Sequence, residues 1–457
     1  MTIEAQSPAI PTEPSPPSPK TLDKLSAPEW SLPRRIWFRF VAVYFVILFF
    51  PMPLTNVLPE GGEFIEKLWM DTIWLPIDRF VAKFVLRLPG EISHEVNGSG
   101  DTLFDYVHMF TIFCTAMIIA TIWSGVQRNR KEHAALESAF QIWLRYTLAS
   151  IMIIYGAIKV VKLQFPTPSP LQLIKTYGDS SPMNLLWTFM GFSTPYTFFA
   201  GLMETIPGML LFYRRTALLG ALMGMGVMTN VVLLNFCYDV PVKLFSTHLL
   251  VMAFLIALPD VKRLLTFFLK NVSVEPAPVR EPFAARWKER TRIVAKSAFI
   301  AVFLGGQVYG LWTQAHEYGP AAKQPPMQGP YEVESFVRDG QELPPLLTDN
   351  RRPRYFVVQG FGERRFAALK MMNGERKNYF FQLDQEKKTM TLEAPDENDN
   401  PATPYSLHYD EPREGVIEFE GTLEGSAIRV TMHKVKADNS LLMNRGFHWV
   451  NEVPFNR

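Results

Sequence analysis

Polar and ionisable side chains gather near the ends of long apolar segments in the first two thirds of the chain. A charged group within the depth of a membrane is costly, so such groups normally face a bundle interior or a wet cavity and mark a functional site. One apolar segment ends and the next begins at the short turn N-F-C-Y-D-V-P-V-K-L, residues 235–244, where the chain re-enters the membrane. We predict a polar pocket near this turn, built from Tyr155, Lys159, Glu204, Asn230, Asn235, Tyr238, Asp239, Lys243 and His248.

Glu204 is central to this prediction because a buried carboxylate needs a proton or a cation nearby. Lys159 and His248 are the cations that the sequence offers. Two interpretations stay open: a polar pocket that opens to the outer face, or a structural ion pair (or a neutral, hydrogen-bonded carboxyl) that fixes the register of the helices. Convergence of several polar residues from three segments favours the pocket.

Seven apolar stretches are long enough to cross a bilayer, at about 36–54, 105–126, 142–163, 185–213, 216–237, 243–258 and 294–313. The connecting loops carry their basic residues on one side only, as the positive-inside rule requires. We therefore predict a multi-pass membrane protein, with a cytoplasmic N-terminus and an extracytoplasmic C-terminal domain.

The predicted domain order is a disordered cytoplasmic tail at 1–33, a helical membrane domain at 34–313, a linker at 314–330 and a β-domain at 331–457. Residues 62–88 mix charged, aromatic and aliphatic side chains at helical spacing. This pattern predicts an amphipathic segment on the outer membrane surface, with Trp69 and Trp74 among the lipid headgroups. A helix packed over the mouth of the bundle is the alternative.

Short runs with period-two alternation fill the last 125 or so residues, with turn signals at Asp339-Gly340 and Asn373-Gly374. They predict an all-β antiparallel domain resembling a barrel. Its interior is expected to be filled by bulky side chains, with a small apolar ligand as the alternative. The segment from Leu441 to Arg457 is expected to add a strand and a covering tail.

Composition excludes several classes of protein. A net charge of +2 gives no bulk attraction to nucleic acid, and two cysteines exclude a disulfide scaffold. The sequence holds no nucleotide-binding loop, G-x-S-x-G, H-E-x-x-H or redox cysteine pair, and its histidines lack the spacing of metal ligands, so no metal site is predicted. Whether the protein is an enzyme stays open.

Several motifs resemble the DoxX-like bacterial membrane proteins. The stretch G-L-M-E-T-I-P-G-M-L-L at 201–211, followed by Arg214-Arg215, is similar to the hairpin of their four-helix unit. The stretches at 97–102, 177–183, 187–193 and 235–246, with R-G-F-H-W-V-N-E-V-P-F-N-R at the C-terminus, resemble a long and uncharacterised subgroup. The resemblance implies a four-helix unit within the bundle. It also implies a link to quinone chemistry, because DoxX is associated with a thiosulfate:quinone oxidoreductase; only Glu204 matches a position of the hairpin.

Three functions compete on this basis. The first is an accessory subunit that binds membrane lipid and other membrane or envelope proteins. The second is a quinone-linked oxidoreductase component, in which Glu204, Asp239 and His248 carry protons and Lys159 or Asn230 binds the quinone oxygens. The third is a protein that handles or transports a lipid or another small molecule, and it draws on helix breaks expected at Pro195 and Pro207.

Overall fold

The computed structural model describes residues 29–57, 59–94, 97–275, 286–361, 364–395, 401–436 and 440–455. Most of the predicted N-terminal tail, residues 1–28, lies outside them. The chain divides into two compact units that alternate along the sequence, and the last boundary between them falls within one long helix. The first unit holds the residues up to Phe50 with Met70–His94 and Leu103–Trp143, and the second holds Pro51–Trp69, Glu95–Thr102 and Leu144–Arg457.

The first unit is helical. It contains α2 (Leu32–Phe49), the end of η1 (Leu68–Trp74), α4 (Leu75–Phe80), η2 (Val81–Val85), α5 (Leu103–Val126) and the start of α6 (Ala134–Val160). Helices α2 and α5 pack against each other. At one end of this pair, Arg39 is buried and donates a hydrogen bond from Nε to His133 Nε2 at 3.1 Å. Phe38 stacks on the same imidazole, so apolar contacts and a hydrogen bond hold this end together.

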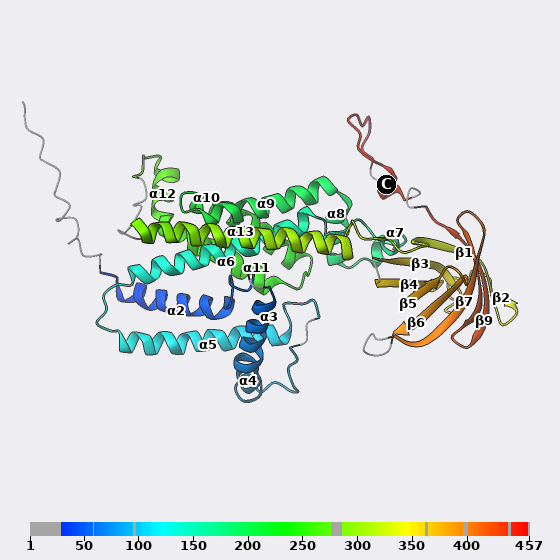
Figure 1. The fold of residues 1–457 in the computed structure, drawn as a ribbon, viewed down its shortest axis with the longest axis horizontal. Helices are drawn as coiled ribbons and strands as arrows, with labels where there is room; N and C mark the ends of the chain where they lie inside the picture. Colours follow the sequence, from blue (N-terminus) through cyan, green and yellow to red (C-terminus); the bar gives the residue numbers. More distant parts are fainter. Residues whose placement is uncertain are drawn as a thin grey trace, which may run out of the picture. The chain divides into compact units, whose positions relative to one another are not determined.

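The helices of the second unit are α3 (Pro59–Lys67), α7 (Pro170–Leu173), η3 (Tyr177–Asp179), α8 (Pro182–Phe192), α9 (Thr194–Phe212), α10 (Ala217–Cys237), α11 (Lys243–Ala257), η4 (Leu258–Asp260), α12 (Val261–Lys270), α13 (Arg286–Glu317) and α14 (Leu441–Asn444). Helix α10 packs against both α9 and α11 (Figure 1). The single span expected at 185–213 is broken between α8 and α9. Ser193 caps α9 by accepting a hydrogen bond from the Tyr196 N–H, and Pro195 occupies the first turn, so a new helix begins there.

Within the described residues, five helical segments are long and apolar enough to cross a membrane: Leu103–Val126, Ala134–Val160, Ala217–Cys237, Lys243–Lys270 and Trp287–Glu317. Many of their large apolar side chains are exposed, including Ile118, Ile122 and Leu233. An apolar exposed surface of this kind suits lipid rather than water. The chain is therefore a membrane protein.

The C-terminal residues form the expected antiparallel β-barrel (Figure 1). Its strands are β1 (Gly329–Arg338), β2 (Gln341–Glu342), β3 (Pro353–Phe361), β4 (Arg364–Met371), β5 (Arg376–Asp384), β6 (Thr389–Pro395), β7 (Pro401–Arg413), β8 (Val416–Leu423) and β9 (Ser426–Lys434). The strands pair in the order β1-β3-β4-β5-β6-β7-β8-β9, and the short strand β2 pairs with β1. Pairing of β1 with β9 closes a ring of eight strands. The pairs Phe336–Val430 and Val430–Phe419 fix the register across the closure.

Side chains fill the barrel interior. Alternate residues of the strands point inward, and Phe356, Phe381, Met390, Leu392 and Phe419 are each buried to 3% exposure or less. The rings of Phe356 and Phe419 meet edge to face at 5.4 Å. A residual cavity of about 40 Å³ is left among these side chains, which is room for a water molecule rather than for an organic ligand.

Candidate functional site

Close packing of α6 against α9 creates the centre of the predicted pocket. A methyl group added to Gly201 on α9 would meet the carbonyl oxygen of Gly156 on α6 at 2.6 Å, so the two backbones touch at this point. Small residues allow membrane helices to approach in this way. Lys159 and Glu204 each lie three residues beyond the glycine of their own helix. The contact therefore brings them onto adjoining faces.

Lys159 and Glu204 form a buried ion pair. Lys159 Nζ lies 2.6 Å from Glu204 Oε2, and the two side chains are 9% and 7% exposed. The ammonium group also donates a hydrogen bond to the carbonyl oxygen of Tyr155 at 3.3 Å and lies 5.7 Å from the centre of the Tyr155 ring. Lys159 thus supplies the cation that the sequence required for Glu204.

This ion pair lines a cavity of about 150 Å³ in the second unit. Most of the wall is apolar and aromatic, with Phe165, Trp187, Tyr196 and Phe245 among its residues. Gln164 also lines it, and its Oε1 atom is buried without a hydrogen-bond partner in the structure. An apolar cavity with a few polar groups at one wall is the usual form of a small-molecule site.

Five of the nine predicted pocket residues line this cavity: Tyr155, Lys159, Glu204, Asn230 and Asn235. Asn235 is also held in place, because its Nδ2 donates a hydrogen bond to Ser246 Oγ on α11 at 2.9 Å. The remaining four residues, Tyr238, Asp239, Lys243 and His248, are not among the lining residues.

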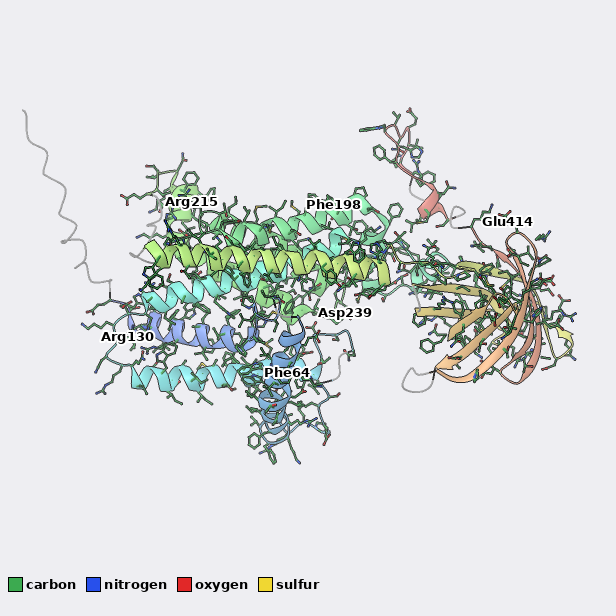
Figure 2. The ribbon with its side chains drawn as sticks, viewed as in Figure 1. Phe64, Arg130, Phe198, Arg215, Asp239 and Glu414 are labelled. Atoms are coloured by element: carbon green, nitrogen blue, oxygen red, sulfur yellow. The ribbon has the colours of Figure 1, made fainter. Side chains whose placement is uncertain are left out.

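Those other residues lie in the turn between α10 and α11 and on the first turns of α11. Asp239 has an 85% exposed side chain that pairs with Lys243 Nζ at 2.8 Å, and it lies at the end of α10 opposite to Arg215 (Figure 2). His248 Nδ1 lies 2.7 Å from the carbonyl oxygen of Leu244 on its own helix. Tyr238 packs with an apolar cluster around Phe165 and Val240.

Asp101 caps α11, a role that sequence reasoning missed. Its carboxylate accepts hydrogen bonds from the backbone N–H groups of Lys243 at 2.8 Å and Leu244 at 3.0 Å. The preceding Gly100 N–H donates to the carbonyl oxygen of Pro241 at 2.8 Å. A carboxylate at a helix start is stabilising, but the cap comes from 142 residues earlier in the chain, so local sequence could not reveal it.

A second buried polar pair in the first unit was also missed. Asp78 on α4 is fully buried, and its Oδ2 lies 2.7 Å from His108 Nδ1 on α5. Trp74 is buried beside it, with its ring 5.5 Å from that of His108, so its side chain packs against protein. The periodicity of residues 62–88 gave no sign that an aspartate would face inward.

No cluster of three or more potential metal ligands occurs among the described residues. The membrane-length helices, the buried ion pair and the separate barrel define an integral membrane protein with a candidate small-molecule cavity. No family model matches the chain, and no solved structure matches it. The chain is 34% identical over 134 residues to the uncharacterised protein YwoB of Bacillus subtilis (strain 168), and the match covers 29% of this chain and 85% of YwoB. The chain therefore belongs to the same family as YwoB.

Proposed function

We propose that this protein holds an amphiphilic small molecule in the cavity beside Lys159 and Glu204, and that it acts as an accessory subunit of a membrane complex. The observation that carries the proposal is a buried ion pair on the wall of an otherwise apolar cavity. Desolvating two charges is costly, and an apolar replacement of equal volume would serve stability as well or better. A pair that faces a cavity can instead bind the polar end of a ligand, while Phe165 and Trp187 contact its apolar part.

For the whole chain we propose seven spans in the bacterial inner membrane. Helices α2 and α9, of 18 and 19 residues, would join the five membrane-length segments. Arg214 and Arg215 at one end of α10, and the α10–α11 turn at the other, support a cytoplasmic N-terminus and a barrel outside the cytoplasm. The Gly201–Leu211 segment of α9, followed by Arg214 and Arg215, supports membership of the DoxX-like proteins.

The ligand itself can be identified by native mass spectrometry of the protein gently extracted from its own membrane, with organic extraction of what is bound. We expect the wild type to retain about one molecule per chain and Glu204→Gln to lose it. Asp239→Asn is the matched control, because Asp239 lies at the same end of the bundle but outside the cavity. A folded Glu204→Gln variant that retains the ligand would contradict the proposal.

A quinone is the second candidate ligand. It is favoured by the combination of an ammonium and a carboxyl group with aromatic walls, since quinone reduction needs proton donors beside an apolar slot. Electrons would come from a partner protein in the same complex. A quinone in the extract would turn the assignment from accessory subunit to oxidoreductase component, whereas a phospholipid would favour lipid handling.

A further inference from the structure

A second and larger cavity, of about 630 Å³, lies beyond the C-terminal end of α6. It is lined by the segment that follows α6, by the linker after α13 and by residues of β3 and β4. All of these residues belong to the second compact unit. Its volume is within the range of sites for organic ligands.

The charged group of this cavity is Lys162, whose side chain is buried. Its ammonium group donates hydrogen bonds to the Gly191 carbonyl oxygen at 2.8 Å and to the hydroxyl oxygens of Thr194 and Thr167 at 2.9 and 3.2 Å. These acceptors are neutral, and the residues that line the cavity include no aspartate or glutamate.

Lys159, three residues earlier, provides the contrast. Its charge is balanced by Glu204 at 2.6 Å, whereas an ion pair of Lys162 is not found within the described residues. Buried charges are normally paired. Lys162 therefore leaves a net positive charge at the wall of the larger cavity.

The backbone conformation of Lys162 is also unusual for a lysine. Its φ is +58°, the left-handed conformation that closes α6, and the Leu163 N–H donates to the Ile158 carbonyl oxygen at 2.8 Å. Glycine or asparagine normally occupies this position of a helix end. Lys162 thus adopts a conformation that is unfavourable for lysine, and strain of this kind is typical of functional positions.

Two side-chain amides complete the polar wall. Gln328 and Gln359 line the cavity, and the Oε1 atom of each is buried without a hydrogen-bond partner in the structure. A side-chain amide carries both donors and an acceptor, so a rotated amide can present N–H groups to an anion. Pro166, Tyr318 and Phe366 supply the apolar part of the wall.

We propose that this cavity binds an anionic amphiphile, with its phosphate or carboxylate headgroup on Lys162 and the two glutamine amides and its apolar chain against Pro166, Tyr318 and Phe366. The headgroup supplies the negative charge that Lys162 lacks, and charge-assisted hydrogen bonds to a buried ammonium are strong. This site is separate from the cavity at Glu204 and does not rest on the function proposed for that cavity.

The test is binding of three probes to the full-length protein in a neutral detergent, followed by thermal unfolding and by native mass spectrometry. Dodecyl phosphate carries both the anion and the chain, sodium phosphate carries the anion alone, and dodecanol carries the chain alone. We expect dodecyl phosphate to raise the Tm of the wild type and to bind at least tenfold more tightly than either other probe. Equal binding of dodecanol, or tight binding of sodium phosphate alone, would overturn the proposal without any variant.

Variants then locate the site. Lys162→Asn removes the charge and suits the left-handed backbone, so we expect a folded protein whose affinity for dodecyl phosphate falls at least tenfold, while Lys162→Arg retains most of it. Lys323→Gln, at an exposed lysine of the linker, should bind as the wild type does. Unchanged affinity in Lys162→Asn would place the anion elsewhere, and a loss in Glu204→Gln alone would assign the probe to the other cavity.

Discussion

Replacing Gly201 by alanine should loosen the helix contact that holds the ion pair. The added methyl group would lie 2.6 Å from the Gly156 carbonyl oxygen, 0.8 Å short of the 3.4 Å at which ordinary contact begins. Backbone atoms of α6 and α9 must separate to admit it, because the nearest atom is not the end of a flexible side chain. Overpacking of this kind costs about 1–3 kcal/mol. The same movement would lengthen the contact between Lys159 and Glu204.

The assay is equilibrium unfolding of the purified protein in detergent, alongside quantification of the ligand that co-purifies. Gly226→Ala on α10 is the matched control, because a methyl group at that glycine would meet no atom within 4 Å. Alanine is favoured over glycine in a helix by up to about 1 kcal/mol, so the control should be as stable as the wild type or more so. If Gly201→Ala unfolded like Gly226→Ala and kept the ligand, the packing argument would be refuted.

Three further predictions concern the polar groups. Lys159→Met and Glu204→Leu should each cost about 3–5 kcal/mol in the free energy of unfolding, because each leaves a buried charge alone. The double variant Lys159→Met/Glu204→Leu should cost less than either, and additive losses would exclude a coupled pair. Asp101→Ala should cost about 0.5–2 kcal/mol through loss of the α11 cap, measured by thermal unfolding. Asp239→Asn is the control, because asparagine suits the left-handed φ of +52° at this exposed position, and equal Tm values would refute the capping role. Burial, together with the neighbouring charge of Arg39, lowers the pKa of His133 from 6.5. The contribution of His133 to stability is therefore present above pH 6.5 and is lost as the pH falls through its pKa in the folded protein. The variant His133→Gln should lose less stability on acidification than the wild type, and an unchanged dependence of stability on pH would refute this prediction.

The barrel was predictable because its signals are local. Period-two alternation and turn residues such as Asp339-Gly340 specify hairpins between neighbours in sequence. Closure by pairing of β1 with β9 is a contact between the ends of the domain, which alternation alone does not specify. The length of the apolar segments likewise identified the membrane-length helices. One expected span is divided into α8 and α9, because Ser193 and Pro195 start a new helix.

The site was only partly predictable because its geometry depends on contacts between distant elements. The position of Glu204 within an apolar segment identified it as a residue that needs a partner. The spacing of Tyr155 and Lys159 placed both on one face of their helix. Which cation meets Glu204 depends on the approach of Gly156 to Gly201, a pairing across 45 residues. The inward position of Asp78 depends in the same way on His108.

We propose that the cavity at Lys159 and Glu204 holds a ligand. A cryo-electron microscopy map of the protein, extracted with its native lipids into nanodiscs, tests this most directly. We predict non-protein density in that cavity, with one end within hydrogen-bonding distance of the ion pair and the rest against Phe165 and Trp187. A well-resolved map in which the ion pair is intact and the cavity is empty or closed by side chains would contradict the claim and leave Lys159 and Glu204 as a structural pair.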